Sequence, residues 1–73
     1  MENEELKKAL LSRRPVIHNY PLHGSVRYSC VSAVIYRRNE NGGIDTEAEL
    51  YDRCAHSVMI SEPKYIRYAD EGE

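Results

Sequence analysis

The residues of this chain best suited to chemistry are its two cysteines and three histidines, spread over 73 residues. Thiolate and imidazole groups are the ligands that tetrahedral zinc prefers, so Cys30, Cys54 and His56 with His18 or His23 have the right ligand types. Their spacing does not match a zinc knuckle, because the sequence has no Cys-x-x-Cys or His-x-x-x-His pair. We therefore predict no metal site and no cofactor, with both cysteines as free, buried thiols.

Nucleophilic catalysis is the other chemistry that these residues could support. Cys54 and His56 are two positions apart, which would place them on one face of an extended strand. The segment around Ala55 has the pattern of a turn, however, and no third residue is placed to orient the histidine. A domain of this length also has little room for a cleft. We therefore predict that the chain is not an enzyme.

Tyrosine stands out in the composition, with six residues beside no Phe and no Trp. Together with arginine it is enriched at the hot spots of protein interfaces. We predict a protein-binding surface with the candidate residues Tyr20, Leu22, Val34, Tyr36 and Tyr51. Val34 and Tyr36, expected on the outward side of their strand, could also supply a symmetric patch for a homodimer. Some tyrosines must serve the core, and we expect Tyr28 and Tyr65 there.

Binding of single-stranded DNA or RNA is the alternative from a different class. Arginines could contact phosphates while tyrosines stack on bases. The candidate residues for this alternative are Arg27, Arg37, Arg38 and Arg53. The carboxylates of Asp45, Glu47 and Glu49 oppose it, because they are well placed to pair with arginines of the neighbouring strand. A third alternative is a small ligand held at a seam between subunits.

Charge is distributed unevenly along the chain, whose formal net charge is −2. Half of the acidic residues lie in the first five and last four positions, so the body of the chain is mildly basic. The acidic start has the wrong sign for an export signal, and no run of about 18 apolar residues is present to span a bilayer. We predict a cytoplasmic protein with no membrane contact.

The elements that position these residues begin with a short helix over residues 4–12. Asn3 is a suitable N-cap, Leu6 and Ala9 belong to an apolar stripe, and Pro15 ends helical geometry. This helix could close one end of the fold or dock on a partner. We expect it to close the fold, because so small a chain needs every apolar contact.

The rest of the chain has the pattern of short antiparallel strands, with β-branched and tyrosine-rich runs separated by Gly, Asn and Pro. We expect strands over residues 16–19, 25–38, 44–51, 57–61 and 66–68. Within the second strand the alternation changes phase, which predicts a bulge or bend near Ser29 and Cys30. Residues 39–43 predict a hairpin loop, and Pro63 predicts a single tight turn before the last strand.

Two segments lie outside the predicted helix and strands. The loop from Tyr20 to Gly24 holds an aromatic residue, a proline and a leucine where polar residues are expected. It is either a lid over one end of the fold or a contact site. The acidic end of the chain, residues 69–73, is expected to fray.

Taken together, these elements predict one domain over residues 1–73, mainly β within the α+β class. Strands in this order, the second long and bent, can close into a small barrel that leaves few free edges. An open sheet packed on the helix is the competing arrangement. In strand order, residues 15–68 resemble a small SH3-like five-stranded antiparallel barrel, here with an N-terminal helix. The aromatic ligand-binding signatures of particular SH3-like families are not present at matching positions.

Residues 14–19 and 31–38 resemble stretches of small uncharacterised proteins of phages and prophages in gut Firmicutes. The resemblance implies no activity. It suggests a setting in which a small non-catalytic module acts by occupying a surface, as an accessory protein or an inhibitor. The predicted function is therefore protein binding, with a host protein, a phage protein or a second copy as the partner.

Overall fold

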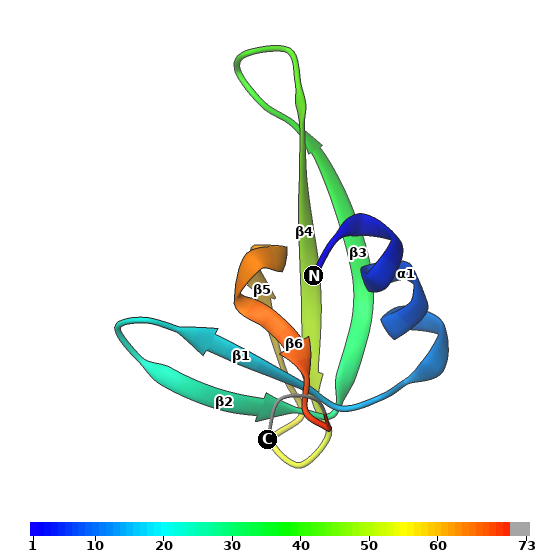
Figure 1. Cartoon of the computed structure of the whole chain (residues 1–73), viewed down its shortest axis with the longest axis vertical. Helices are drawn as coiled ribbons and strands as arrows, with labels where there is room; N and C mark the ends of the chain where they lie inside the picture. Colours follow the sequence, from blue (N-terminus) through cyan, green and yellow to red (C-terminus); the bar gives the residue numbers. More distant parts are fainter. Residues whose placement is uncertain (71–73) are drawn as a thin grey trace.

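The computed structural model describes residues 1–70, which form one α-helix, one 3-10 helix and two three-stranded antiparallel sheets (Figure 1). The helix, α1 (Asn3–Ser12), agrees with the predicted range within one residue. Its N-cap is Glu2 rather than Asn3, and the Glu2 backbone N–H donates to the Glu5 carboxylate at 3.4 Å. Arg13, in the left-handed region at φ 57°, ends the helix.

The first sheet has the strand order β2-β1-β6. Its strands are β1 (Val16–Tyr20), β2 (Gly24–Tyr28) and β6 (Ile66–Tyr68). A single 3-10 turn, η1 (Pro63–Tyr65), leads into β6, which confirms the tight turn predicted at Pro63. In the central strand His18 lies opposite Val26 on one side and Ile66 on the other.

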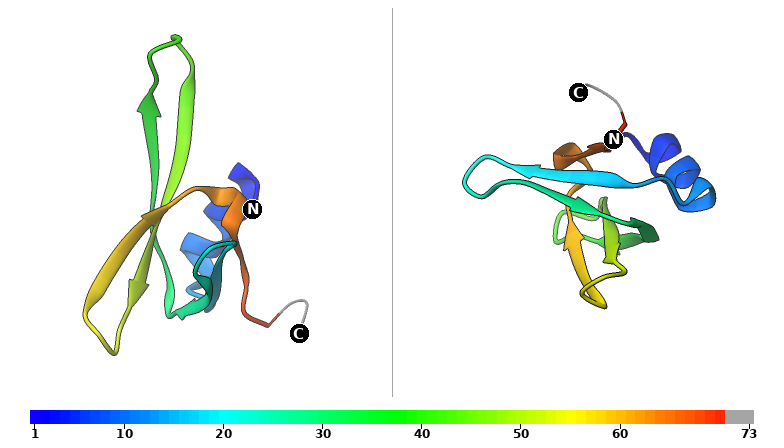
Figure 2. Two further views of the ribbon diagram at one scale, coloured as in Figure 1. Left: turned by 90° about the vertical axis from the view of Figure 1, so that its left-hand side faces the viewer. Right: turned by 90° about the horizontal axis from the view of Figure 1, so that it is seen from below.

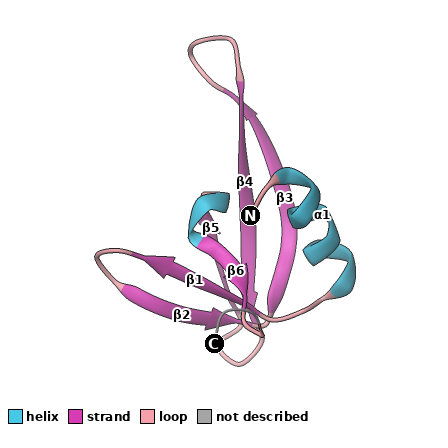
Figure 3. Cartoon of the chain, viewed as in Figure 1, coloured by secondary structure: helices cyan, strands magenta, loops and turns pink. Residues whose placement is uncertain are grey.

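The second sheet has the order β3-β4-β5 and carries the longest hairpin of the fold (Figure 3). Its strands are β3 (Cys30–Arg38), β4 (Ile44–Asp52) and β5 (Ser57–Ser61). The predicted loop over residues 39–43 is confirmed: the Asn39 side chain accepts from the N–H groups of Asn41 and Gly43, and Gly42 takes φ 81°.

The segment predicted as one long strand is two strands in different sheets. Ser29 separates β2 from β3, and its N–H donates to the Tyr51 carbonyl at 2.8 Å. A second irregularity follows between Val31 and Ala33, where the register against β4 shifts. The bend inferred from the change of phase is thus confirmed, and it transfers the chain from one sheet to the other.

The core lies between the two sheets and beneath α1. Its buried residues are Leu6, Ala9, Val16, Val31, Ala48, Leu50, Ile66 and Tyr68. Because Leu6 and Ala9 of the helix are fully buried, α1 contributes to the core, as predicted. Figure 2 shows the helix beside the sheets and the β1–β2 hairpin extending away from them.

Several sequence-based expectations need correction. Strand pairing over residues 1–70 stays within the two sheets, so a closed five-stranded barrel is not observed, although the mainly β, α+β class is. The SH3-like resemblance stays a prediction.

Among the tyrosines Tyr68 is the buried one, with the Arg14 guanidinium 3.6 Å from its ring centre. Tyr28 packs only at the margin of the core, and Tyr65 lies outside it.

The predicted fraying does not extend to the first residues of the C-terminal segment. Ala69 is buried, and its N–H donates to the Pro15 carbonyl at 3.0 Å. Asp70 forms an ion pair with Arg14 at 2.6 Å. Residues 71–73 lie outside the described part. Over residues 1–70, no helix is long and apolar enough to cross a bilayer.

Candidate functional site

Four aromatic side chains gather near the turn of the β1–β2 hairpin, and we call them the aromatic cluster: His18, Tyr20, His23 and Tyr65. Tyr20 is the centre of the cluster. Its ring centroid lies 4.9 Å from that of Tyr65, edge to face, and 5.5 Å from that of His23, stacked. The His18 ring is also stacked on that of Tyr20, with a centroid distance of 6.1 Å. Edge-to-face and offset stacking are the favourable geometries for such rings.

Local backbone structure explains why these rings meet. His18 and Tyr20 are two positions apart on β1, so their side chains point to the same face. A tight turn then returns the chain: the His23 N–H donates to the Tyr20 carbonyl at 3.1 Å, and Gly24 takes φ 75°. Tyr65 comes from η1, which pairing of β6 with β1 brings alongside.

A groove of about 500 Å³ runs between the aromatic cluster and β5. Its other lining residues are Glu47, Met59, Ile60, Ser61 and Glu62. Methionine and tyrosine side chains give this groove an adaptable apolar floor with polar tips at its margin. The Tyr28 hydroxyl donates to the Met59 sulfur at 3.4 Å, which fixes one side of the floor.

The loop after Tyr20 is exposed. Residues 21–24 are all exposed, and Leu22 keeps 81% of its surface accessible at the tip of the hairpin. Figure 2 shows this hairpin projecting beyond the sheets. The loop therefore does not cover an end of the fold, and of the two roles predicted for it the lid is not the one observed.

The other predicted surface residues lie apart from the aromatic cluster. Val34, predicted to point outward, packs against the core beneath α1, so that prediction is wrong. Tyr36 shares its face of β3, and its hydroxyl donates to the Asn3 side chain at 2.6 Å. The helix α1 packs against this face of the sheet, although Tyr36 stays 50% exposed. The symmetric patch stays a prediction. Tyr51 lies on the opposite face, paired in register with Cys30 and Val58.

The four arginines proposed for nucleic-acid binding do not form one surface. Arg27 lies on β2 in the first sheet. Arg37 and Arg38 end β3, near the loop at the top of Figure 1, and their side chains point to opposite faces of the sheet. Arg53 directly follows the last residue of β4, at the other end of the hairpin. Arg37 also forms an ion pair within the chain, since its Nε donates to the Glu47 carboxylate at 2.6 Å.

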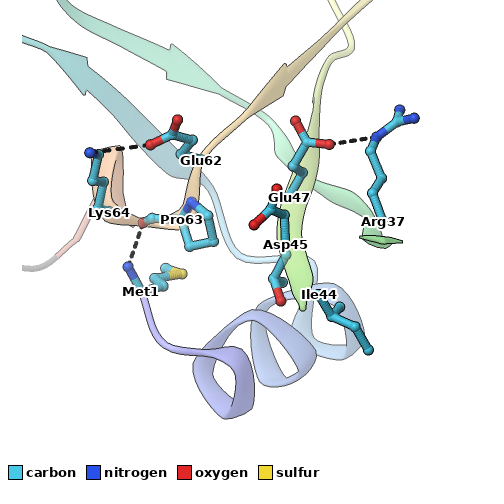
Figure 4. Close-up of a pocket in the computed structure, with 9 residues that line it drawn as sticks. Met1, Arg37, Ile44, Asp45, Glu47, Glu62, Pro63 and Lys64 are labelled. Atoms are coloured by element: carbon cyan, nitrogen blue, oxygen red, sulfur yellow. Dashed lines mark hydrogen bonds and ion pairs between the residues drawn. The ribbon is translucent and has the colours of Figure 1, made fainter. Parts of the chain in front are cut away.

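A second groove, of about 740 Å³, lies between the β3–β4 hairpin and η1 (Figure 4). Ion pairs occupy its two walls: Arg37 with Glu47, and Lys64 with Glu62 at 3.3 Å. On the η1 side, the Met1 amino group donates to the Pro63 carbonyl at 2.6 Å. Because these groups already have partners within the chain, this groove is a weaker candidate than the aromatic one.

Cysteine placement differs from the prediction. Cys30 is half-buried and Cys54 is exposed, because the turn after β4 carries Cys54 to the surface. Both are free thiols. Over residues 1–70, no three His, Cys, Asp or Glu side chains come together in a group that could hold a metal ion.

Burial lowers the pKa of His18, and the nearby His23 lowers it further. The unfolded chain therefore binds a proton at this residue more readily than the folded chain.

We expect the free energy of unfolding to decrease as the pH falls through about 6.5, the ordinary histidine value, toward the lowered pKa of His18. Urea titrations between pH 7.5 and 5.5 should show part of this dependence removed in His18→Gln. The control His56→Gln should keep it, and a His18→Gln profile as steep as that of the wild type would contradict the assignment.

Sequence analysis identified Tyr20 and Leu22 but missed most of their neighbours. Met59 was not proposed, His18 and His23 were considered only as metal ligands, and Tyr65 was assigned to the core. The two-residue spacing of His18 and Tyr20 on a predicted strand was the available signal.

Comparisons of the chain with protein-family models, curated proteins and solved structures found no match.

Proposed function

We propose that this chain is a non-catalytic binding module that holds an extended segment of another protein in the groove beside the aromatic cluster. The observation that carries the proposal is the packing of three rings around that of Tyr20, two stacked and one edge to face, at the edge of an open groove. Rings of this kind supply a large contact area with few rotatable bonds, so little conformational entropy is lost on binding.

The shape and chemistry of the groove favour an apolar, extended partner. Aromatic-lined grooves bind polyproline II segments, whose backbone is already extended and costs little to order. Leu22 at the hairpin tip and Ile60 at the groove wall add exposed apolar surface on either side. The carboxylates of Glu47 and Glu62 at the margin already have partners within the chain, so the apolar contacts are the main source of affinity.

Nucleic-acid binding is the less favoured function. The described residues that line the groove include no lysine or arginine, so a strand that stacked on the aromatic cluster would find no such cation there for its phosphates. The candidate arginines are distributed over both sheets and do not border the groove. Measurement at two salt concentrations separates the two functions, because phosphate binding weakens steeply with salt.

The biological setting that we propose is cytoplasmic, with a role as a phage accessory protein or an inhibitor of a host protein. The similarity of residues 14–19 and 31–38 to phage and prophage proteins supports this setting. A location of the gene in a housekeeping operon, away from any prophage, would remove that support.

Tyr20→Ala tests the proposed groove. Peptides selected on the wild-type chain from a random display library should lose at least about tenfold in affinity, because a central interface tyrosine is removed. Tyr51→Ala is the matched control, since Tyr51 does not line the groove, and it should leave the affinity unchanged. The affinity should also be nearly constant with salt. Failure to recover peptides, or equal binding by both variants, would refute the proposed site.

A further inference from the structure

β5 is an edge strand without the features that usually keep such strands from pairing. Within residues 1–70 it pairs only with β4, and Figure 2 shows it at the margin of the second sheet. Its sequence, Ser-Val-Met-Ile-Ser, contains no charge, proline or glycine. Val58 and Ile60 remain 56% and 41% exposed. Natural edge strands usually carry a lysine, a proline or a bulge, so this edge is open to another strand.

The hydrogen-bonding groups of this edge can be assigned from the neighbouring strand. The Tyr51 carbonyl accepts from Ser29, on the β3 side of β4. Because antiparallel strands alternate, the adjacent residue Leu50 directs its N–H and C=O toward β5. Leu50 lies opposite Met59, so Met59 turns its peptide groups toward β4. Val58 and Ile60 therefore turn theirs to the free edge.

The sequence of β5 is self-complementary about Met59. If two copies pair antiparallel around this residue, Val58 of one copy lies opposite Ile60 of the other. Both residues direct their peptide groups outward, as a hydrogen-bonded pair requires. Ser57 lies opposite Ser61, and the two Met59 residues form the central non-hydrogen-bonded pair. The β-branched side chains then form one apolar row on the outer face of the joined sheet.

The residues at the two ends of the strand are compatible with the same register. His56 precedes β5 in a turn, at φ 52°, and Glu62 follows β5. A twofold axis therefore brings these ends of the two copies near each other without placing like charges together. The strand itself is uncharged, and no like charges are brought together within it.

We propose that the occupant of this edge is a second copy of the chain, joined through β5 into a twofold dimer with a continuous six-stranded sheet. This surface differs from the helix-covered face of Val34 and Tyr36. It shares Met59, Ile60 and Ser61 with the lining of the aromatic groove, so dimer formation and peptide binding can influence each other. Peptide binding measured on a monomeric β5 variant keeps the two proposals separate.

Sedimentation equilibrium tests the dimer directly. The average mass should rise from the 8.4 kDa of one chain toward twice that value as concentration increases. Val58→Lys should hold the mass at that of one chain, because a charge would face Ile60 of the other copy across the pair. Ile44→Lys is the control, since Ile44 is an exposed apolar residue at the far end of β4. It should associate like the wild type. A wild-type mass that stays at 8.4 kDa up to about 1 mM, or equal association of both variants, would overturn the proposal.

Cysteine cross-linking tests the register. In a background with Cys30→Ser and Cys54→Ser, Met59→Cys should form a disulfide-linked dimer under mild oxidation. The paired Cα atoms would be about 4.5 Å apart, within disulfide range. Ser57→Cys is the matched control, because its two copies would be separated by four residues, about 13 Å along the strand. Cross-linking at least about tenfold faster at position 59 is expected. Equal rates would exclude this register.

Discussion

Leu50→Ala should cost the domain a large part of its stability, lowering the free energy of unfolding by about 3–5 kcal/mol. Leu50 is fully buried in β4, the central strand of the second sheet, between Val31 on β3 and Met59 on β5. Truncation would leave a cavity that neither neighbouring strand can fill, because each is held in register. A chain of this length has a total stability of about 4–11 kcal/mol, so the variant should be close to unfolding.

Urea denaturation followed by circular dichroism measures this effect. Ile44→Ala is the matched control, because Ile44 begins the same strand but is 70% exposed. It should change the free energy of unfolding by no more than about 0.5 kcal/mol. Similar losses in the two variants would mean that the two sheets do not enclose Leu50 as described.

Local elements were predictable because their signals lie within a few residues. The acidic first turn and Pro15 bounded α1, and Asn39 with the two following glycines marked the hairpin loop. Pro63 marked η1 for the same reason, since proline fixes φ and suits the first position of such a turn. In each case the determining residue is inside or beside the element that it specifies.

The division of the strands between two sheets was harder to predict from the sequence. The change of phase near Ser29 indicated a bend, but a bend does not reveal whether its two halves share a sheet. That outcome depends on β1 pairing with β6, a segment distant in sequence, as well as with β2. Burial of Val34 has a similar cause, because α1 covers the face that alternation alone had left open.

The aromatic cluster was predictable only in part for the same reason. Tyr20 could be proposed from its own loop, and His18 shares its face through simple alternation. Tyr65 joins them only because β6 returns beside β1. A tyrosine assigned to the core from composition alone thus proved to belong to a surface groove.

Leu6→Ala should lower the free energy of unfolding by about 2–4 kcal/mol, whereas Leu11→Ala should change it by about 0.5 kcal/mol or less. Both leucines lie on α1, so their helix propensities are matched. Leu6 is fully buried in the core and Leu11 is 83% exposed.

Comparison of the two leucine variants determines whether α1 unfolds cooperatively with the sheets. The alternative is that α1 unfolds independently and can bind another protein. If α1 belongs to the core, urea should unfold helix and sheets together, with the same midpoint by far-ultraviolet circular dichroism and by tyrosine fluorescence. A Leu6→Ala variant that loses helical signal but keeps the wild-type midpoint of the sheets would place α1 outside that core. In that case its apolar stripe would become available to another protein, as the sequence alone had allowed.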